Sequence, residues 1–527
     1  MWYNSPFVPI GLDKGGIFMG KKLPIFYSAL LLTGVNLLLR FISTSFQVYL
    51  SGKIGATGIG LVQLVLSVGT LAMTASMGGI RTATMYLSAE AVGQKRPRCL
   101  SWILSGCILY SVALSSTIAF LMFHFAPLIA SRWIGNSDTV SAIRLLSCFL
   151  PVNSLCGVII GHFTGVNKIG TLAIVEVAEQ IFSMIITIAL LILWAGNSPV
   201  KACHCILMGS GLGACFTLTV LLLLNKKESY GHAHRISMRK KLWETAVPLA
   251  IADNAKVGIS TTENLIVPKR LALYKGESSP LGAFGMVCGM VFPILMFPAA
   301  ILFGLTELLI PELARCNAAG SKERIRHLAE RSLLLALVYG CLCGGILFLS
   351  AEKICIIFYK SEEAAQYLRR FALLAPMLYS DTIIDAMIKG LGQQSKSVRY
   401  NIITSAMDVA LLFILLPRYG MRGYFLSFLV THFINFILSI RLLLKLTGRI
   451  IRFGTITYSV MAIFFGVISG THLPNQFKVI GFVMIFMILI KIFKVITKKD
   501  IDWMRCLIRG KRETSADSTS DFVPNRQ

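Results

Sequence analysis

The sequence predicts an all-α polytopic membrane protein with about 14 transmembrane helices. Of its 527 residues, 55% are hydrophobic and 14% are charged, whereas a soluble globular chain has about 45–50% apolar and about 25% charged residues. The mean hydropathy is +0.71. One core of this size cannot bury such an excess of apolar side chains, so lipid must be the main solvent of the chain.

Apolar stretches of about 18–25 residues, the length that crosses the hydrocarbon layer as a helix, follow one another along the chain. The predicted spans are 25–50, 60–88, 99–123, 141–165, 171–195, 203–224, 244–267, 282–311, 328–350, 365–391, 398–416, 422–445, 454–470 and 477–497. The connections between them are short and leave no room for a soluble catalytic domain. We therefore expect a protein that is not an enzyme.

The net charge of +26 comes from short basic clusters between the apolar stretches. The clusters lie in alternate connections, at 95–98, 226–241, 315–326, 396–399 and 445–452, and in the tail at 498–512. Such clusters mark cytoplasmic loops, so the sequence predicts a multi-pass protein of the cytoplasmic membrane with both termini in the cytoplasm. A nucleic-acid-binding protein would gather its basic residues on one face, and we expect no nucleic-acid partner.

No motif predicts a metal or a cofactor. The thirteen cysteines lack metal-ligand spacing and a loop-rich secreted frame, so they do not predict disulfides. Cys203, His204 and Cys205 are adjacent, but a closed zinc site needs four ligands. Residues 15–22 (GGIFMGKK) have the spacing of a P-loop, but Lys22 stands where that motif requires Ser or Thr.

Two pairs of similar loops indicate an internal duplication. AVGQKRPR (91–98) is similar to AAGSKERIR (318–326), and GVNK (165–168) is similar to GQQSK (392–396). Both pairs are separated by 227 residues, which spans six predicted helices. An even number of helices gives the two halves the same orientation, as in transporters built from parallel repeats.

The duplication predicts two six-helix lobes with two further C-terminal helices. The expected organisation is an N-lobe at 19–224, a basic cytoplasmic loop at 225–243, a C-lobe at 244–447, the last two spans at 448–497 and a cytoplasmic tail, basic and then disordered, at 498–527. Lys14-Gly15-Gly16 can be encoded by a ribosome-binding sequence. We therefore expect translation to begin at Met19 and residues 1–18 to be an extension.

Polar residues form a stripe along the first predicted span. Six polar residues fall within an arc of about 100° on a helix: Thr33, Asn36, Arg40, Ser43, Thr44 and Gln47. A charged residue at the centre of a span costs about 2.5–3.5 kcal/mol on insertion scales. Arg40 is therefore expected to face a wet cavity or a partner.

Other predicted spans carry charges as well. They are Arg81 in the second, Glu176 and Glu179 in the fifth, Asp253, Lys256, Ser260 and Glu263 on one face of the seventh, and Asp381, Asp385 and Lys389 in the tenth. Two interpretations remain open, because Asp253 with Lys256, and Asp385 with Lys389, could also be ion pairs that only neutralise each other.

A cationic and polar cavity between two lobes suits an amphipathic anion. Basic side chains would bind phosphate, hydroxyl and amide groups would bind sugars, and apolar flanks would accept a lipid tail. The candidate substrate-binding residues are Arg40, Lys256, Arg81, Asn36, Ser43 and Gln47. The candidate ion-coupling carboxylates are Asp253, Glu263, Asp381, Asp385 and Glu179.

Four stretches resemble a known family. They are STTENLIVPKRL (260–271), GMVFPILMFPAAILFGLTELLIPELA (289–314), DTIIDAMIKGLGQQ (381–394) and RYNIITSAMDVALLFILLPRYGMRGY (399–424). The chain resembles the polysaccharide flippases of the multidrug/oligosaccharidyl-lipid/polysaccharide exporter superfamily, and most of all the stage V sporulation protein B-like proteins. The resemblance implies a 14-helix flippase that moves undecaprenyl-linked glycans outward, with a role in spore-cortex peptidoglycan in the sporulation members.

The resemblance also implies residue roles. Arg40 matches the basic residue of the first helix in lipid II flippases, but Phe46 and Gln47 stand where a second arginine is expected. Lys256 lies where relatives often have Arg, and Ser183 lies where an Arg commonly follows a Glu-Gln pair. Because Lys lacks the bidentate geometry of Arg, these differences bear on the substrate more than on the transport class.

Three alternatives remain, one of them in the same superfamily and two in other functional classes. A Na⁺- or H⁺-coupled multidrug exporter of the same superfamily would have a pocket dominated by carboxylates, whereas Arg40, Arg81 and Lys256 favour an anion. A membrane enzyme would need a large outer loop. A non-transporting scaffold would have no use for costly intramembrane charges. We expect transport by alternating access, with a lipid-linked glycan and membrane lipids as partners and cell-wall synthesis proteins as candidate partners.

Overall fold

The computed structural model describes residues 25–93, 100–166, 168–196, 198–225, 238–448, 453–472, 474 and 477–493. Within these ranges the regular structure is entirely helical, which confirms the predicted all-α class. The predicted extension at 1–18, the basic clusters at 95–98 and 449–452, most of the loop at 225–243 and the tail at 498–527 lie outside the described residues.

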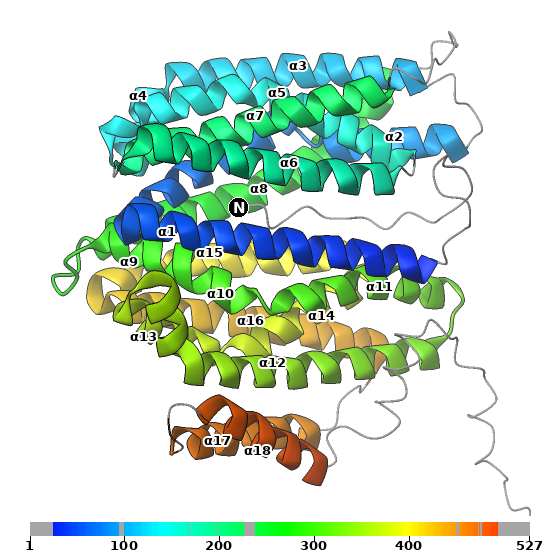
Figure 1. Ribbon diagram of the computed structural model, residues 1–527. Helices are drawn as coiled ribbons and strands as arrows, with labels where there is room; N and C mark the ends of the chain where they lie inside the picture. Colours follow the sequence, from blue (N-terminus) through cyan, green and yellow to red (C-terminus); the bar gives the residue numbers. More distant parts are fainter. Residues whose placement is uncertain are drawn as a thin grey trace, which may run out of the picture.

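The first half of the chain, residues 25–225, forms the upper group of helices in Figure 1 together with part of the centre. Its elements are α1 Ile25–Met77, α2 Ile80–Gly93, α3 Leu100–His124, α4 Ala126–Leu128, η2 Ile129–Ile134, η3 Ser137–Thr139, α5 Val140–Gly165, α6 Ile169–Leu190, η4 Leu191–Ala195 and α7 Pro199–Asn225.

The second half, residues 238–447, forms most of the lower group in Figure 1. Its elements are α8 Met238–Leu271, α9 Pro280–Met286, η5 Val287–Val291, α10 Phe292–Met296, α11 Ala299–Ala318, α12 Lys322–Tyr359, α13 Glu362–Ala372, α14 Ala375–Gly390, α15 Gln394–Tyr419 and α16 Met421–Thr447. Two further helices, α17 Phe453–Thr471 and α18 Lys478–Ile492, pack against α12 at the edge of this group.

Glycines break the first helices. α1 covers the first predicted span and most of the second, and Gly55, with φ 69° and ψ 178°, interrupts the helix between them. Gly78 and Gly79, at φ 49° and 70°, separate α1 from α2 inside the predicted span 60–88. These backbone angles favour glycine because a Cβ atom disfavours positive φ. The second predicted span is therefore helical but broken in the middle.

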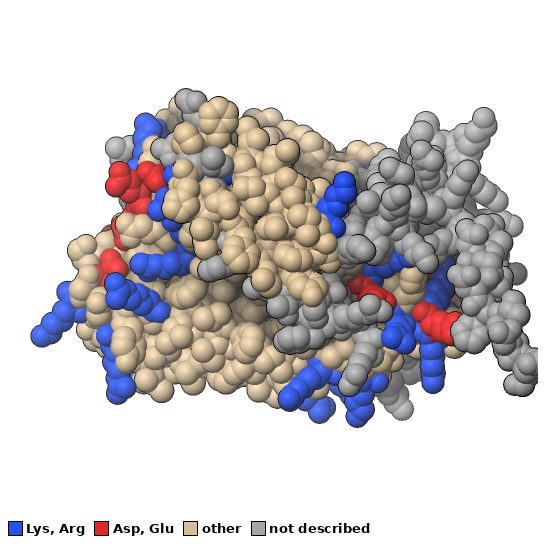
Figure 2. Space-filling model, turned by 90° about the horizontal axis from the view of Figure 1, so that it is seen from below, with Lys and Arg blue, Asp and Glu red and all other residues tan. Residues whose placement is uncertain are grey.

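Every predicted span overlaps a helix, but the predicted number of about 14 spans is not confirmed. Eight helical stretches of the described residues are long and apolar enough to cross a membrane, and up to ten if each of two bent pairs is one span. One of the eight, Leu37–Val92, includes the break at Gly55. In Figure 2 the Lys, Arg, Asp and Glu side chains gather toward the two ends, with a broad uncharged area between them.

Hydroxyl groups inside the spans bond to their own helices. Ser67 donates to the carbonyl oxygen of Gln63 at 2.8 Å, and Thr70 donates to that of Leu66 at 2.9 Å. Because lipid cannot hydrogen-bond to a polar side chain, this local bond lowers the cost of placing Ser or Thr in a span.

A close contact attaches α18 to the second half. A Cβ atom on Gly345 of α12 would lie 2.1 Å from the ring of Phe482. Phe482 is fully buried in a cluster with Cys341 and Phe486. Only glycine lets the ring approach α12 so closely.

Candidate substrate and ion-coupling site

A broken helix lies at the centre of the candidate site. The eighth predicted span consists of α9, η5, α10 and α11, and α11 is bent by 62° from the preceding helical segment. The break falls at Phe297-Pro298. Proline lacks an N–H group, and π-helical turns such as η5 change the bonding pattern, so backbone carbonyls in this span need other donors.

Side chains from the first helix and from the second half bond to those carbonyls. Arg40 donates to the carbonyl oxygen of Met296 at 2.6 Å, and its guanidinium lies 5.5 Å from the ring centre of Phe303. Gln47, two turns further along α1, donates to the carbonyl oxygen of Gly289 in η5 at 3.1 Å. Two predicted substrate-binding residues therefore lie against the broken helix.

Tyrosine hydroxyl groups bond to further carbonyls beside the break. Tyr379 of α14 donates to Leu295 at 2.6 Å, and Tyr339 of α12 donates to Pro298 at 2.9 Å. Both rings stack, with centroids 6.0 Å apart. The sequence analysis missed both tyrosines. Pro298 inside an apolar stretch indicates that some backbone carbonyls there lack a helical N–H donor. It does not indicate which side chains donate to those carbonyls instead.

Two further predicted substrate-binding residues belong to the first helix. Ser43 lies on α1 between Arg40 and Gln47 and is half-buried. The side chain of Asn36 is outside the described part of the structure.

The polar face of α8 leads to a pair of carboxyl groups. Asp253 and Lys256 are exposed and interact electrostatically with each other. Further along α8, Glu263 faces Asp408 of α15 closely enough for a hydrogen bond between the two carboxyl groups. Such a bond requires a proton on one of the two, because two ionised carboxylates both lack a donor.

Asp408 is buried and well supplied with donors. Its side chain accepts hydrogen bonds from Ser427 at 2.6 Å and from Thr431 at 3.1 Å, both in α16. The sequence analysis did not identify Asp408 as a candidate. The signal was present, since Asp408 is the one acidic residue in the apolar stretch 401–417, but its partner Glu263 is too distant in the sequence to be inferred.

The acidic residues of α14 have separate partners. Asp381 accepts a hydrogen bond from Asn435 of α16 at 3.1 Å, and its other carboxylate oxygen is buried with no hydrogen-bond partner among the described residues. Asp385 forms an ion pair with Lys389 at 2.6 Å and accepts a hydrogen bond from Ser397. The predicted intrahelical ion pair is therefore present, whereas Asp381 is incompletely bonded.

Arg81 lies in a different environment from Arg40. It interacts electrostatically with Glu176 and Glu179 of α6. Glu179 accepts a hydrogen bond from Thr217 of α7 at 2.6 Å. Arg81, a predicted substrate-binding residue, and Glu179, a predicted coupling residue, thus belong to one cluster within the first half.

Comparisons with known proteins agree with this architecture. Residues 270–414 match the MatE family model. Stage V sporulation protein B of Bacillus subtilis (strain 168) is 22% identical over 407 residues, which cover 75% of this chain and 78% of that protein. Sporulation protein YkvU of the same organism is 22% identical over 277 residues, which cover 50% of this chain and 61% of that protein.

Solved structures extend the likeness to nearly the whole chain. The lipid II flippase MurJ in an inward closed conformation aligns with a TM-score of 0.63 at 14% identity, over 91% of this chain and 99% of that one. The inward-facing conformation of a multidrug resistance MATE family transporter of the MOP superfamily aligns with a TM-score of 0.62 at 15% identity, over 82% and 98%. Residues 270–414 thus match the MatE family model, and the chain shares the fold of solved MOP-superfamily transporters.

Proposed function

We propose that the protein is a flippase that moves undecaprenyl-linked glycan precursors, of peptidoglycan or another polysaccharide, outward across the cytoplasmic membrane. The observation that carries the proposal is the contact of Arg40 with the broken helix at Met296. In membrane transporters, discontinuous helices near the midplane form the substrate site. Here the side chain that bonds to the carbonyl beside the break is an arginine, whose guanidinium group is suited to binding phosphate.

In this mechanism Arg40 exchanges partners. A hydrogen bond from a guanidinium to a phosphate is charge-assisted and about twice as strong as a neutral one. A lipid-linked diphosphate that enters the site would therefore displace the carbonyl oxygen of Met296 from Arg40. Loss of that bond would release α1 from the broken helix and favour movement of one half against the other.

The carboxyl pair Glu263–Asp408 would couple transport to an ion. Two adjacent carboxyl groups share a proton or bind a cation, and either event changes the charge of α8 relative to α15. Asp381, with one unpaired oxygen, is the next candidate. Asp253, Asp385 and Glu179 are weaker candidates, because each faces a basic partner.

The two halves would rock as parallel lobes at 19–224 and 244–447, with both termini in the cytoplasm. Reporter fusions test the orientation: a fusion at Gly276, between α8 and α9, should report the outside, and one at Lys396 should report the cytoplasm. A cytoplasmic Gly276 would contradict this topology.

A Na⁺- or H⁺-coupled multidrug exporter is the second candidate. The likeness to MATE transporters and the carboxylates of the second half favour it. Proteoliposomes separate the two proposals. Labelled lipid II and a teichoic-acid precursor should be flipped, and an organic cation should not be transported. Transport of the cation with no flipping of either lipid would favour the exporter.

A further inference from the structure

The second predicted span of each half is broken. In the first half, Gly78 and Gly79 interrupt the span between α1 and α2 with positive φ angles of 49° and 70°. In the second half, the break falls at Phe297-Pro298, between α10 and α11. Lipid offers no hydrogen bond to a backbone carbonyl that has lost its helical donor. Each break therefore needs donors from neighbouring helices.

The donors in the first half come from its third and fourth spans. Tyr110 of α3 donates to the carbonyl oxygen of Gly78 at 3.2 Å. Ser154 of α5 donates to the carbonyl oxygen of Ser76 at 3.1 Å. Ser76 and Ser154 are fully buried. The break is thus held from two sides by its own half.

The donors in the second half occupy similar places in the predicted duplication. Tyr339 of α12 and Tyr379 of α14, which donate to carbonyls beside the second break, also belong to the third and fourth spans of their half. Tyr339 lies 229 residues after Tyr110, and Tyr379 lies 225 residues after Ser154. Both separations are within two residues of the 227 that relate the similar loops. The two breaks are therefore held in corresponding ways.

Close glycine contacts attach the segment beyond the first break to its own half. A Cβ atom on Gly161 of α5 would lie 2.3 Å from the carbonyl oxygen of Arg81. A Cβ atom on Gly165 of α5 would lie 2.6 Å from the carbonyl oxygen of Met85. Because the two backbones approach so closely, α2 has no room to turn against α5 and moves with it.

The segment before the break, residues 56–77 of α1, also contacts the second half. A Cβ atom on Gly60 would lie 2.3 Å from the carbonyl oxygen of Leu281 in α9. Thr261 of α8 donates to the carbonyl oxygen of Ser67 at 3.2 Å. The break therefore separates a segment that is bonded to the second half from a helix that is closely packed in the first.

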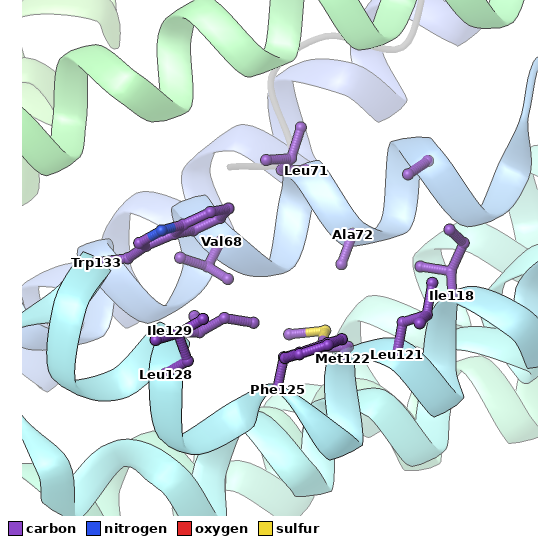
Figure 3. A pocket seen from close by; sticks show the side chains of 11 residues that line it. Val68, Leu71, Ala72, Ile118, Leu121, Met122, Phe125, Leu128, Ile129 and Trp133 are labelled. Carbon is purple, nitrogen blue, oxygen red and sulfur yellow. The ribbon is translucent and has the colours of Figure 1, made fainter.

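Free space lies beside the segment before the break. An apolar groove of about 300 Å³ separates this segment from α3, α4 and η2. Val68, Leu71 and Ala72 line it from α1, and Phe125 and Trp133 are among the residues on the other side (Figure 3). All the lining side chains are hydrophobic. A swing of the segment toward α3 would therefore bury apolar surface in the groove.

We infer that the break at Gly78-Gly79 is a hinge of the first half. When the contacts with α8 and α9 open, residues 56–77 swing about it toward α3 and close the groove, while α2 stays with α5. The break at Phe297-Pro298 is the matching hinge of the second half. Hinges are a few residues at the ends of elements, and glycines adopt the required backbone angles at little cost. The inference concerns motion and not substrate, so it goes beyond the proposed function and applies to a flippase and an exporter alike.

Distances between spin labels on the full chain in nanodiscs test this inference. Labels attached through a non-canonical amino acid avoid the thirteen native cysteines. The first pair, at the exposed residues Thr57 and Phe120, joins the swinging segment to α3. The second pair, at the exposed residues Val92 and Leu109, joins α2 to α3. A hinge changes the first distance and leaves the second unchanged.

Thr261→Val removes the hydrogen bond to Ser67 with little change in size. It should raise the population with a shorter first-pair distance about twofold to tenfold, the effect of one hydrogen bond. Thr262→Val is the matched control, because Thr262 is exposed and donates within α8. If Thr261→Val does not fold, Ser67→Ala weakens the same contact from the other side and should act in the same direction.

The free space is tested in the Thr261→Val background. Ala72→Phe fills the groove and should remove the population with the shorter first-pair distance. Ala113→Phe, on the exposed face of α3, adds the same side chain outside the groove and should leave that population unchanged.

The donors are tested by Tyr110→Phe, which removes only a hydroxyl group. A carbonyl at the first break loses its donor, so the first-pair distance should spread over a broader range. Tyr86→Phe, at an exposed position of α2, is the matched control. Tyr339→Phe should instead broaden the distance between labels at the exposed residues Ser278 and Asn317, on either side of the second break.

Equal changes in the first and second pairs would show that the first half moves as one body, and would overturn the inference. A first-pair distance that stays constant in Thr261→Val and in Ser67→Ala would overturn it as well, and so would a shorter distance that persists in Ala72→Phe. Because the measurement needs no substrate, a negative result leaves the proposed function standing. Conversely, a chain that flips no lipid-linked glycan can still show the hinge.

Discussion

The two halves of the chain contain different kinds of charged cluster among their helices. In the first half, Arg81 faces Glu176 and Glu179, so basic and acidic groups lie together. In the second half, Glu263 faces Asp408, and the neighbouring donors to Asp408 are the neutral hydroxyls of Ser427 and Thr431. The cluster of the first half combines a basic group with carboxyl groups, whereas the pair of the second half is entirely acidic.

This difference predicts different roles. In a cluster of opposite charges each charge has a partner within the protein, so the cluster needs no ion from solution, whereas removal of one partner is costly. Two adjacent carboxyl groups repel each other when both are ionised, so they share a proton or bind a cation between them. We therefore expect the groups that respond to an ion gradient in the second half, to which Arg40 connects the first helix through its bond to Met296.

The largest effect is expected at Arg81. Arg81→Met leaves two carboxylates without their basic partner and should cost about 3–5 kcal/mol of stability. The triple variant that also has Glu176→Gln and Glu179→Gln should recover most of this loss. Thermal unfolding in detergent measures both. A stable Arg81→Met protein that has lost binding of lipid-linked diphosphate would instead make Arg81 a substrate ligand, as the sequence analysis predicted, and would weaken the contrast between the halves.

The second effect is expected at the carboxyl pair. Asp408→Asn removes one of the two adjacent carboxyl groups and should reduce the response of transport to an ion gradient by up to about 100-fold, a coupling free energy of about 2.7 kcal/mol. The measurement compares flipping in proteoliposomes with and without imposed H⁺ and Na⁺ gradients. Glu263→Gln should behave alike. Asp385→Asn tests a weaker candidate and should keep most of the response, because its carboxylate is already paired with Lys389. A full gradient response in Asp408→Asn would exclude this pair as the coupling site.

The third effect is expected at Arg40. Arg40→Ala removes a charge-assisted phosphate contact and should weaken binding of lipid-linked diphosphate about tenfold to a hundredfold, while membrane insertion is retained. Arg40→Lys should keep part of the affinity because the charge remains. Arg422→Ala, at the exposed start of α16, is the matched control. Unchanged binding in a folded Arg40→Ala protein would mean that Arg40 serves only to bond Met296.

Local pattern predicted the helices, but not the partners of their polar residues. Hydropathy and length located the spans, and Arg40 was identified because a charge inside an apolar stretch is costly. Its acceptor is the carbonyl of Met296, 256 positions away in the sequence, and that contact depends on how α1 packs against α10. Asp408 was missed for the same reason, since its importance comes from Glu263 on another helix. The glycines and prolines at which helices break can be identified in the sequence, but the angle between the helical segments on either side cannot.

The smallest effect is expected at the intrahelical pair of α14. Lys389 and Asp385 form an ion pair at 2.6 Å, but their side chains are 37% and 30% exposed. An accessible pair of this kind contributes about 0.2–1 kcal/mol. Lys389→Ala should therefore lower stability within that range and change transport less than about fivefold, because Asp385 keeps its hydrogen bond from Ser397. If Lys389→Ala instead removed the gradient response as strongly as Asp408→Asn, the unpaired Asp385 would have to interact with Asp381. The coupling site would then extend along α14 rather than lie between α8 and α15.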